Sequence, residues 1–259
     1  MEQTERRVRS ELLEEGRVLR IVLAAGKGNV IDRRAIADLR EGLADAGSAP
    51  ALRAVLLDHE GPHFSFGASV EEHAPGEVET MLPAFHALAR ELLALDLPIL
   101  AAVRGLCLGG GLELAALAER IFAAPGARFG QPEITLGVFA PIGSLLLPRL
   151  VGAAHATELL LTGRTIEAEE AQRMGLVAEL APDPAAAALT WARTHLVDKS
   201  ASSLRFATRA ARAHWIGAFD VALGSLESAY LSELMATRDA REGIAAFLEK
   251  RDPVWADPS

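Results

Sequence analysis

The sequence predicts an α/β protein in which strands and helices alternate first and helices then follow alone. Three observations predict this class. Short β-branched and aliphatic runs alternate with helical periodicities as far as residue 123, a fully apolar run precedes the densest glycine cluster of the chain, and the sequence is helical from Thr165 onward. We therefore expect an α/β core over residues 1–195 and a C-terminal helical region over residues 196–259.

The first elements are two strands with a helix between them. Val18–Ala24 and Arg53–Asp58 are short apolar runs bounded by Gly, Pro or charged residues, as strands are. Asp32 can cap a helix that runs to about Ala46, because apolar residues recur there at i, i+3 and i+7.

The next elements surround the glycine cluster. A helix is expected over Glu77–Leu95, and the apolar run Ile99–Val103 is typical of a strand that is buried on both faces of a sheet. The cluster Gly105–Gly111 follows, then a helical stretch over Leu112–Glu119 and another strand over Arg120–Ala123.

The C-terminal half is predicted to be mainly helical. Residues 165–168 open one helix, and an alanine-rich helix follows Pro184. Three further helices are expected over residues 200–213, 218–235 and 238–250.

Composition excludes several classes of function. The 26 Lys and Arg against 35 Asp and Glu give a net charge of −9, which disfavours nucleic-acid partners. One cysteine excludes a disulfide framework. His59 and His63 are four residues apart, but Gly61 and Pro62 between them argue against the helix that a metal site with this spacing needs. The longest uncharged apolar stretch, Ile134–Pro148, is too short to span a membrane, and Met1–Gly16 lacks the apolar core of a secretory signal. We expect a cytoplasmic protein without a metal or a membrane partner.

The glycine cluster has two interpretations. Gly109, Gly110 and Gly111 stand between a buried strand and a helix, without the Lys-Ser/Thr of a nucleotide-binding P-loop. Free N–H groups at this helix N-terminus favour a site for an anion or an oxyanion. A tight turn with close packing explains the same glycines, so the segment alone leaves both interpretations open.

Glu113 and Glu133 are candidates for acid–base chemistry. Each has apolar neighbours, and burial of a carboxyl raises its pKa toward the range that acid–base catalysis uses. Alternatively, Glu113 is a first-turn residue favoured by the helix dipole and Glu133 is a surface loop residue.

Four segments in order resemble one known family. Ala101–Leu114 and Phe129–Gly137 closely resemble the signature of the enoyl-CoA hydratase/isomerase (crotonase) superfamily. Phe64–Val70 looks like the first acyl-CoA-binding segment of that superfamily, and Glu242–Arg251 is similar to its final helix. The resemblance covers nearly the whole chain and implies the crotonase fold, in which stacked ββα units form a superhelix with a C-terminal helical region.

The resemblance implies a role for each matching residue. The N–H groups of Ala68 and Gly110 would hold the thioester oxygen, and Glu113 and Glu133 would be the catalytic pair. Both glutamates are present, which implies hydration rather than isomerisation or hydrolysis. The remaining substrate-binding and coenzyme A-binding positions would be Phe66, Gly67, Val70, Gly109, Phe247 and Lys250. The implied assembly is a trimer or a pair of trimers, and coenzyme A is part of the substrate, so that no separate cofactor is expected.

Further stretches resemble one subgroup, which hydrates a cyclic dienoyl-CoA in benzoyl-CoA degradation. They are Phe64–His73, Gly137–Pro141 and Ser200–Phe206. The resemblance implies conversion of cyclohexa-1,5-diene-1-carbonyl-CoA to 6-hydroxycyclohex-1-ene-1-carbonyl-CoA. The alternatives are a general enoyl-CoA hydratase or isomerase and, from another class, a non-catalytic scaffold that binds acyl-CoA.

Two departures from the superfamily pattern concern the site. Ser69 stands where the superfamily usually has Asp, which bears on how that loop is held. Residues 138–145 replace a glycine-rich stretch with bulkier residues, which implies an acyl pocket of different shape.

Overall fold

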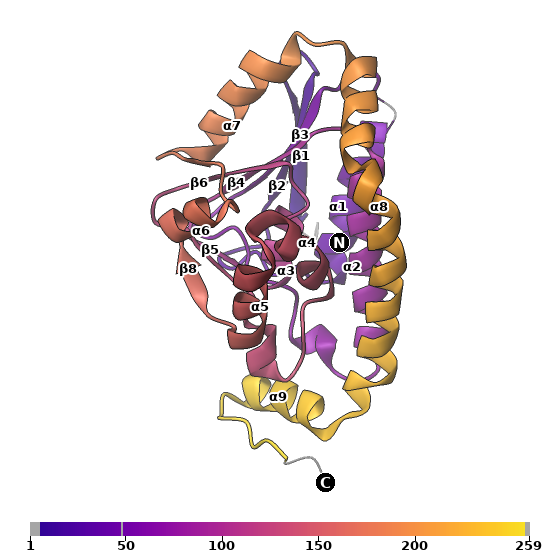
Figure 1. Cartoon of the computed structure of the whole chain (residues 1–259), viewed down its shortest axis with the longest axis vertical. Helices are drawn as coiled ribbons and strands as arrows, with labels where there is room; N and C mark the ends of the chain where they lie inside the picture. The colour runs from indigo at the N-terminus through magenta and orange to yellow at the C-terminus, as the bar shows by residue number, and fades with distance from the viewer. Residues whose placement is uncertain (1–5, 48, 257–259) are drawn as a thin grey trace, which may run out of the picture.

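The computed structural model describes residues 6–47 and 49–256, and its strands form two sheets (Figure 1). In spatial order, the six-stranded sheet contains β1 (Val8–Leu13), β2 (Val18–Leu23), β3 (Ala54–His59), β4 (Ile99–Val103), β6 (Arg120–Ala123) and β9 (Glu179–Leu180). Strand β1 is antiparallel to β2, and the other neighbours are parallel. The smaller sheet contains β5 (Leu106–Leu108), β7 (Arg128–Gly130) and β8 (Thr165–Glu167).

The central strands are apolar throughout because both faces of the large sheet are covered. Val55 and Leu57 face the main hydrophobic core, which also contains residues of α1 (Arg33–Gly47) and α2 (Val78–Ala94). Leu56 between them faces a second core, which contains residues of α7 (Pro184–Ala192). The two-residue period of a strand sends alternate side chains to opposite faces, so burial of both removes the usual alternation with polar residues.

The other helices lie near the small sheet or belong to the C-terminal region of the chain. They are α3 (Gly110–Ala115), α4 (Pro141–Val151), α5 (Ala153–Thr162), α6 (Ala168–Met174), α8 (Ala201–Ser232) and α9 (Arg238–Glu249). Short 3₁₀ segments are η1 (Glu71–His73), η2 (Pro132–Leu136) and η4 (Leu234–Ala236), and residues Arg193–Val197 form a π-helical turn. In the part of the chain that the structure describes, none of the helices could cross a bilayer.

The predicted α/β class is confirmed, and most predicted elements are present within a few residues. Two helix predictions are wrong. Thr165–Glu167 forms β8 instead of opening a helix, because this segment pairs with β7 and buries Ile166. The helices expected over residues 200–213 and 218–235 are one helix, α8, which continues through residues 214–217, where the break was expected, and packs along α2 and α4 (Figure 1).

Strand β1 was missed because it is an edge strand. Four of its six residues are exposed, so it shows neither an apolar run nor a clear alternation. Its hydrogen bonds with β2 define it, and a sequence pattern does not contain that information.

Arginines of α8 bind the carbonyls at the C-terminal end of α2. Arg212 is buried and donates to the carbonyls of Leu93 (2.7 Å) and Leu97 (3.0 Å), and its Nε donates to Glu119 (2.8 Å). Arg205 donates to the carbonyl of Leu95. Positive charge is favourable at a helix C-terminus, where carbonyls lack partners within the helix.

We expect Arg212→Ala to lower the free energy of unfolding by about 2–3 kcal/mol, because three acceptors lose a charged donor. Urea unfolding followed by circular dichroism measures this change. Arg209→Ala is the matched control: its side chain is exposed and pairs with Asp96, so its removal should change the free energy of unfolding much less than that of Arg212. Equal effects of the two substitutions would contradict the assignment.

Candidate active site

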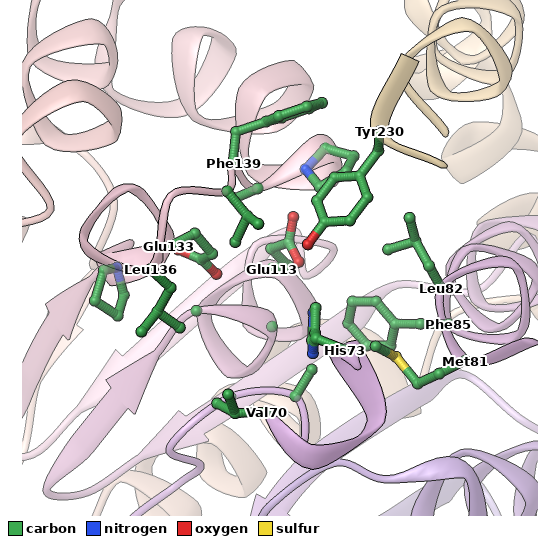
Figure 2. A pocket seen from close by; sticks show the side chains of 18 of the residues that line it. Val70, His73, Met81, Leu82, Phe85, Glu113, Glu133, Leu136, Phe139 and Tyr230 are labelled. Carbon is green, nitrogen blue, oxygen red and sulfur yellow. The ribbon is translucent and has the colours of Figure 1, made fainter. Parts of the chain in front are cut away.

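A partly open cavity of about 70 Å³ lies where α2, α3, α4 and α8 meet two loops (Figure 2). Two glutamates, His73, Tyr230 and backbone groups form its polar part, and the remaining wall is mainly apolar. The lining residues are Phe66, Gly67, Ala68, Val70, His73, Met81, Leu82, Phe85, Gly109, Gly110, Glu113, Pro132, Glu133, Leu136, Val138, Phe139, Ala140, Pro141 and Tyr230. Such a site suits a ligand that is apolar apart from a few fixed polar atoms.

The loop before η1 is held by buried polar contacts. Ser65 donates its hydroxyl to the carbonyl of Asn29 (2.8 Å) and accepts from the N–H of Gly67 (3.0 Å). Gly67 has φ +110°, a conformation that glycine adopts without strain. The hydroxyl of Ser69, the residue that departs from the superfamily pattern, donates to Glu71 (2.9 Å) and accepts from the N–H of Glu72 (3.4 Å). Ser69 thus links the loop to η1.

Close packing explains each residue of the triple-glycine segment. A Cβ on Gly109 would lie 2.7 Å from Oε1 of Glu133, and φ at this residue is +51°. A Cβ on Gly111 would lie 2.6 Å from the Cβ of Ser65. On Gly110, a Cβ would lie 3.1 Å from the backbone nitrogen of Ala68. The absent side chains therefore allow tight packing and bring two backbone segments together beside the cavity.

The backbone N–H groups of Ala68 and Gly110 lack acceptors among residues 6–47 and 49–256. Gly110 is the first residue of α3, where an N–H has no acceptor within the helix. Both residues line the cavity. Two free donors on adjoining backbone segments can bind one oxygen atom that carries developing negative charge.

Glu113 is buried on α3, and the first turn of α4 binds its carboxyl. Its Oε1 accepts from the N–H of Gly143 (2.8 Å). Burial raises the pKa of Glu113, and the amides of Gly143 and Ile142 oppose part of that rise. Gly143 leaves room for Gln131, since a Cβ on Gly143 would lie 2.7 Å from a terminal atom of the Gln131 amide.

Glu133 lies in η2 and reaches the cavity beside Glu113 (Figure 2). Burial raises its pKa most, and the charge of Glu113 raises it further. The buried Gln131 amide can donate from its nitrogen to both carboxylate oxygens of Glu133 (3.1 and 3.0 Å). Two coupled carboxyls that resist ionisation can keep one proton between them at neutral pH, which provides an acid and a base together.

We expect a bell-shaped dependence of kcat/KM on pH. Acid protonates both carboxyls and removes the base, whereas alkali removes the remaining proton and the acid. Because both pKa values are raised, the alkaline decline should lie well above the range near pH 4.3 in which an ordinary glutamate titrates. Steady-state rates between about pH 4 and pH 10 measure this profile, and a rate that stays constant on the alkaline side would contradict it.

The same shifts predict an effect on stability. A carboxyl whose pKa is higher in the folded protein than in the unfolded chain ionises first in the unfolded chain. The folded protein therefore becomes less stable as pH rises from the unfolded pKa of that carboxyl through its folded pKa. Glu133→Gln removes one titration, so its free energy of unfolding should exceed that of the wild type increasingly as pH rises. Urea unfolding at about pH 6 and pH 9 compares the two proteins.

Several lining residues were not predicted as site residues. Met81 and Phe85 lie on the buried face of α2, where helical spacing by itself indicates only a core. Phe139, by contrast, belongs to the stretch 138–145 that the sequence associated with the acyl pocket. Tyr230 lies more than 90 positions from either glutamate in the sequence, on a helix without a motif. His73 also lines the cavity, and its Nδ1 lies 2.7 Å from the carbonyl oxygen of Ser69.

Glu113, Glu133, Ala68 and Gly110 lie together in this cavity, and so do Phe66, Gly67, Val70 and Gly109. Phe247 and Lys250 lie apart from them: both are exposed at the C-terminal end of α9, outside the cavity lining. Their role in binding coenzyme A stays a prediction. Cys107 is buried, and burial raises the pKa of its thiol, so it lacks the features of a nucleophile.

Comparisons with known proteins identify similar chains. A family model described as enoyl-CoA hydratase/isomerase matches residues 14–258. Cyclohexa-1,5-dienecarbonyl-CoA hydratase of Thauera aromatica is 55% identical over 244 residues, which cover 94% of this chain and 95% of that protein. Carnitinyl-CoA dehydratase of Citrobacter koseri is 33% identical over 93% of this chain and 95% of its own. The crystal structure of an enoyl-CoA hydratase/isomerase from Pseudoalteromonas atlantica superimposes with a TM-score of 0.86 and 28% identity, covering 96% of this chain and all of the other.

Proposed function

Because the chain belongs to the enoyl-CoA hydratase/isomerase family, we propose that it hydrates cyclohexa-1,5-diene-1-carbonyl-CoA to 6-hydroxycyclohex-1-ene-1-carbonyl-CoA. It is an enzyme of the hydratase type, and the relative from Thauera aromatica supports the cyclic dienoyl substrate. One observation carries the mechanism: two free backbone N–H groups and two carboxyls with raised pKa values surround one apolar cavity.

The thioester oxygen binds to the N–H groups of Ala68 and Gly110. Attack of water on the conjugated system places negative charge on this oxygen, and two fixed donors stabilise the resulting enolate. Loss of one such donor typically costs about 2.7–4 kcal/mol of transition-state stabilisation. The stabilised thioester needs no metal ion, and the proposed chemistry uses no cofactor beyond the coenzyme A of the substrate.

Glu113 and Glu133 hold one water molecule between them. One carboxylate accepts a proton from this water as its oxygen bonds to the β carbon, and the other carboxyl donates its proton to carbon. In the 1,5-diene, a single bond links the two double bonds at the carbon that bears the thioester. Hydroxide adds at one end of the diene and the proton adds at the other, so the remaining double bond stays conjugated with the thioester.

The wall of the cavity favours a compact acyl group. Phe139, Val138 and Pro141, from the stretch of bulkier residues that departs from the superfamily pattern, supply part of this wall. Bulky side chains at these positions leave less room for a long linear acyl chain than the glycine-rich stretch that they replace.

The test is incubation of the purified protein with the cyclic dienoyl-CoA in ¹⁸O-enriched water, beside crotonyl-CoA as the linear comparison. Hydration labels the ring hydroxyl and leaves the thioester unlabelled, and we expect faster turnover of the cyclic substrate. A preference for crotonyl-CoA would favour a general hydratase, and a shifted double bond without label would favour an isomerase. Binding of the thioester without turnover would indicate a scaffold.

We also propose that the chain forms a homotrimer, or a pair of trimers, in the cytoplasm. Phe247 and Lys250 of one subunit would then approach the coenzyme A nucleotide in a neighbouring subunit, which suits their exposure on α9. Light scattering coupled to size exclusion should give a mass of three or six chains of 27.5 kDa. A monomeric mass at micromolar concentration would contradict this assembly.

A further inference from the structure

Tyr230 is held rigidly at the wall of the cavity that faces the glutamates. It is 1% exposed near the end of α8, within a cluster that includes Val78 and Leu82 of α2. Its ring contacts Phe139 at a centroid distance of 5.3 Å. Figure 2 shows its hydroxyl directed toward the side chain of Glu113, with Val70 on the opposite side of the cavity.

The Tyr230 hydroxyl has no hydrogen-bond partner in the described parts of the chain. Two other buried side-chain atoms share this property there, Nε2 of His86 and Nε of Arg120, but neither residue lines the cavity. An unpaired buried hydroxyl lowers stability, and phenylalanine would fill the same apolar surroundings without that cost. A water molecule or a ligand in the cavity can supply the partner that this hydroxyl needs.

The surrounding groups limit what that partner can be. Burial and the charges of Glu133 and Glu113 raise the pKa of Tyr230, so its hydroxyl keeps the proton and acts as a donor. The thioester oxygen has its own donors at Ala68 and Gly110. The other polar atom of the reaction is the oxygen that lies between the two carboxyls, first as water and afterwards as the ring hydroxyl.

We propose that Tyr230 is a further catalytic residue, whose O–H donates a hydrogen bond to the oxygen that is added to the ring. This inference rests on the proposed function. The bond orients one lone pair of the water toward Tyr230 and leaves another for attack on carbon, while the carboxyls handle the protons. Tyr230 donates a hydrogen bond throughout and transfers no proton. Because of this hydrogen bond, Tyr230 also favours binding of ligands that carry a ring hydroxyl over ligands that lack one.

Tyr230→Phe tests the inference, because it removes only the hydroxyl and keeps the aromatic contact with Phe139. We expect kcat/KM for hydration to fall about 10-fold or more. The affinity for 6-hydroxycyclohex-1-ene-1-carbonyl-CoA should fall similarly, whereas that for cyclohex-1-ene-1-carbonyl-CoA, which lacks the hydroxyl, should not change. Equal losses for the two ligands would show a packing role and overturn the inference, as would unchanged values for both.

A second measurement uses the wild-type protein and needs no variant. Tyr230 is the only tyrosine of the chain, so ¹³C labelling of the tyrosine ring carbon that bears the hydroxyl gives one assignable NMR signal. This signal should move when the hydroxylated thioester binds and move much less with the ligand that lacks the hydroxyl. Equal movement with both ligands would overturn the inference. A wild-type protein that fails to hydrate the dienoyl-CoA would instead refute the proposed function.

Discussion

Replacing Glu113 or Glu133 with glutamine is expected to lower kcat for hydration by about 10²–10⁴-fold, the usual range for a general acid or base. Glutamine keeps the size of the side chain but can neither accept nor release the proton that the pair shares. Substrate binding depends mainly on the apolar wall and the backbone donors, so KM should change much less than kcat. Single-turnover measurements with the cyclic dienoyl-CoA test both variants.

Glu167→Gln is the matched control for these variants. Glu167 is exposed in β8, pairs with Arg128 and lies outside the cavity lining, so its replacement should leave turnover unchanged. Neither active-site variant should be less stable than the wild type at neutral pH, because each removes a carboxyl whose pKa burial raises. Near-normal turnover in both Glu113→Gln and Glu133→Gln would refute the acid–base assignment.

Gly110→Ala is expected to lower kcat/KM by about 10²–10³-fold, the effect of losing a donor to a developing oxyanion. The added Cβ would lie 3.1 Å from the nitrogen of Ala68 and 3.4 Å from its Cβ. The methyl group therefore occupies space beside both N–H donors and displaces the thioester oxygen from them. The proton-transfer groups are untouched, so the pH profile of the residual activity should keep its shape.

Gly217→Ala is the matched control for Gly110→Ala. Gly217 lies within α8, and nothing lies within 4 Å of the position that its Cβ would take. Alanine is favoured over glycine within a helix, so this variant should be as active as the wild type and slightly more stable. If Gly110→Ala keeps full activity while it folds normally, Ala68 and Gly110 do not bind the reacting oxygen.

Much of the fold could be predicted because local patterns and burial agree. The run Ile99–Val103 is apolar at every position because helices cover both faces of the sheet, and Asp32 caps α1 by accepting from the N–H of Ala35 (2.8 Å). The predictions failed where pairing or packing decided the structure. Thr165–Glu167 forms a strand because it pairs with β7. Residues 214–217 do not interrupt α8, which packs along α2 and α4.

For the candidate site as well, some parts could be predicted from the sequence and others depended on packing. The residues that resemble the superfamily motifs, Glu113 and Glu133 among them, lie in contiguous segments whose order and spacing could be recognised, and the family and its hydratase-type activity are confirmed by the comparisons. The sequence alone left open whether the glycines formed a turn or a ligand site. The structure shows the close packing, and the missing Cβ at Gly110 also lets Ala68 and Gly110 line the same cavity, so the ligand site stays a prediction that the packing does not contradict.

The sequence by itself determined the fold class, the family and the chemical groups available for catalysis, because these depend on local patterns and on motifs within single segments. Only the tertiary structure decided which distant side chains complete the cavity. Tyr230 reaches Glu113 across more than a hundred residues of chain because α8 packs against α2 and α4. Burial also sets the pKa values of the two glutamates, and burial is a property of the packed molecule that no single segment contains.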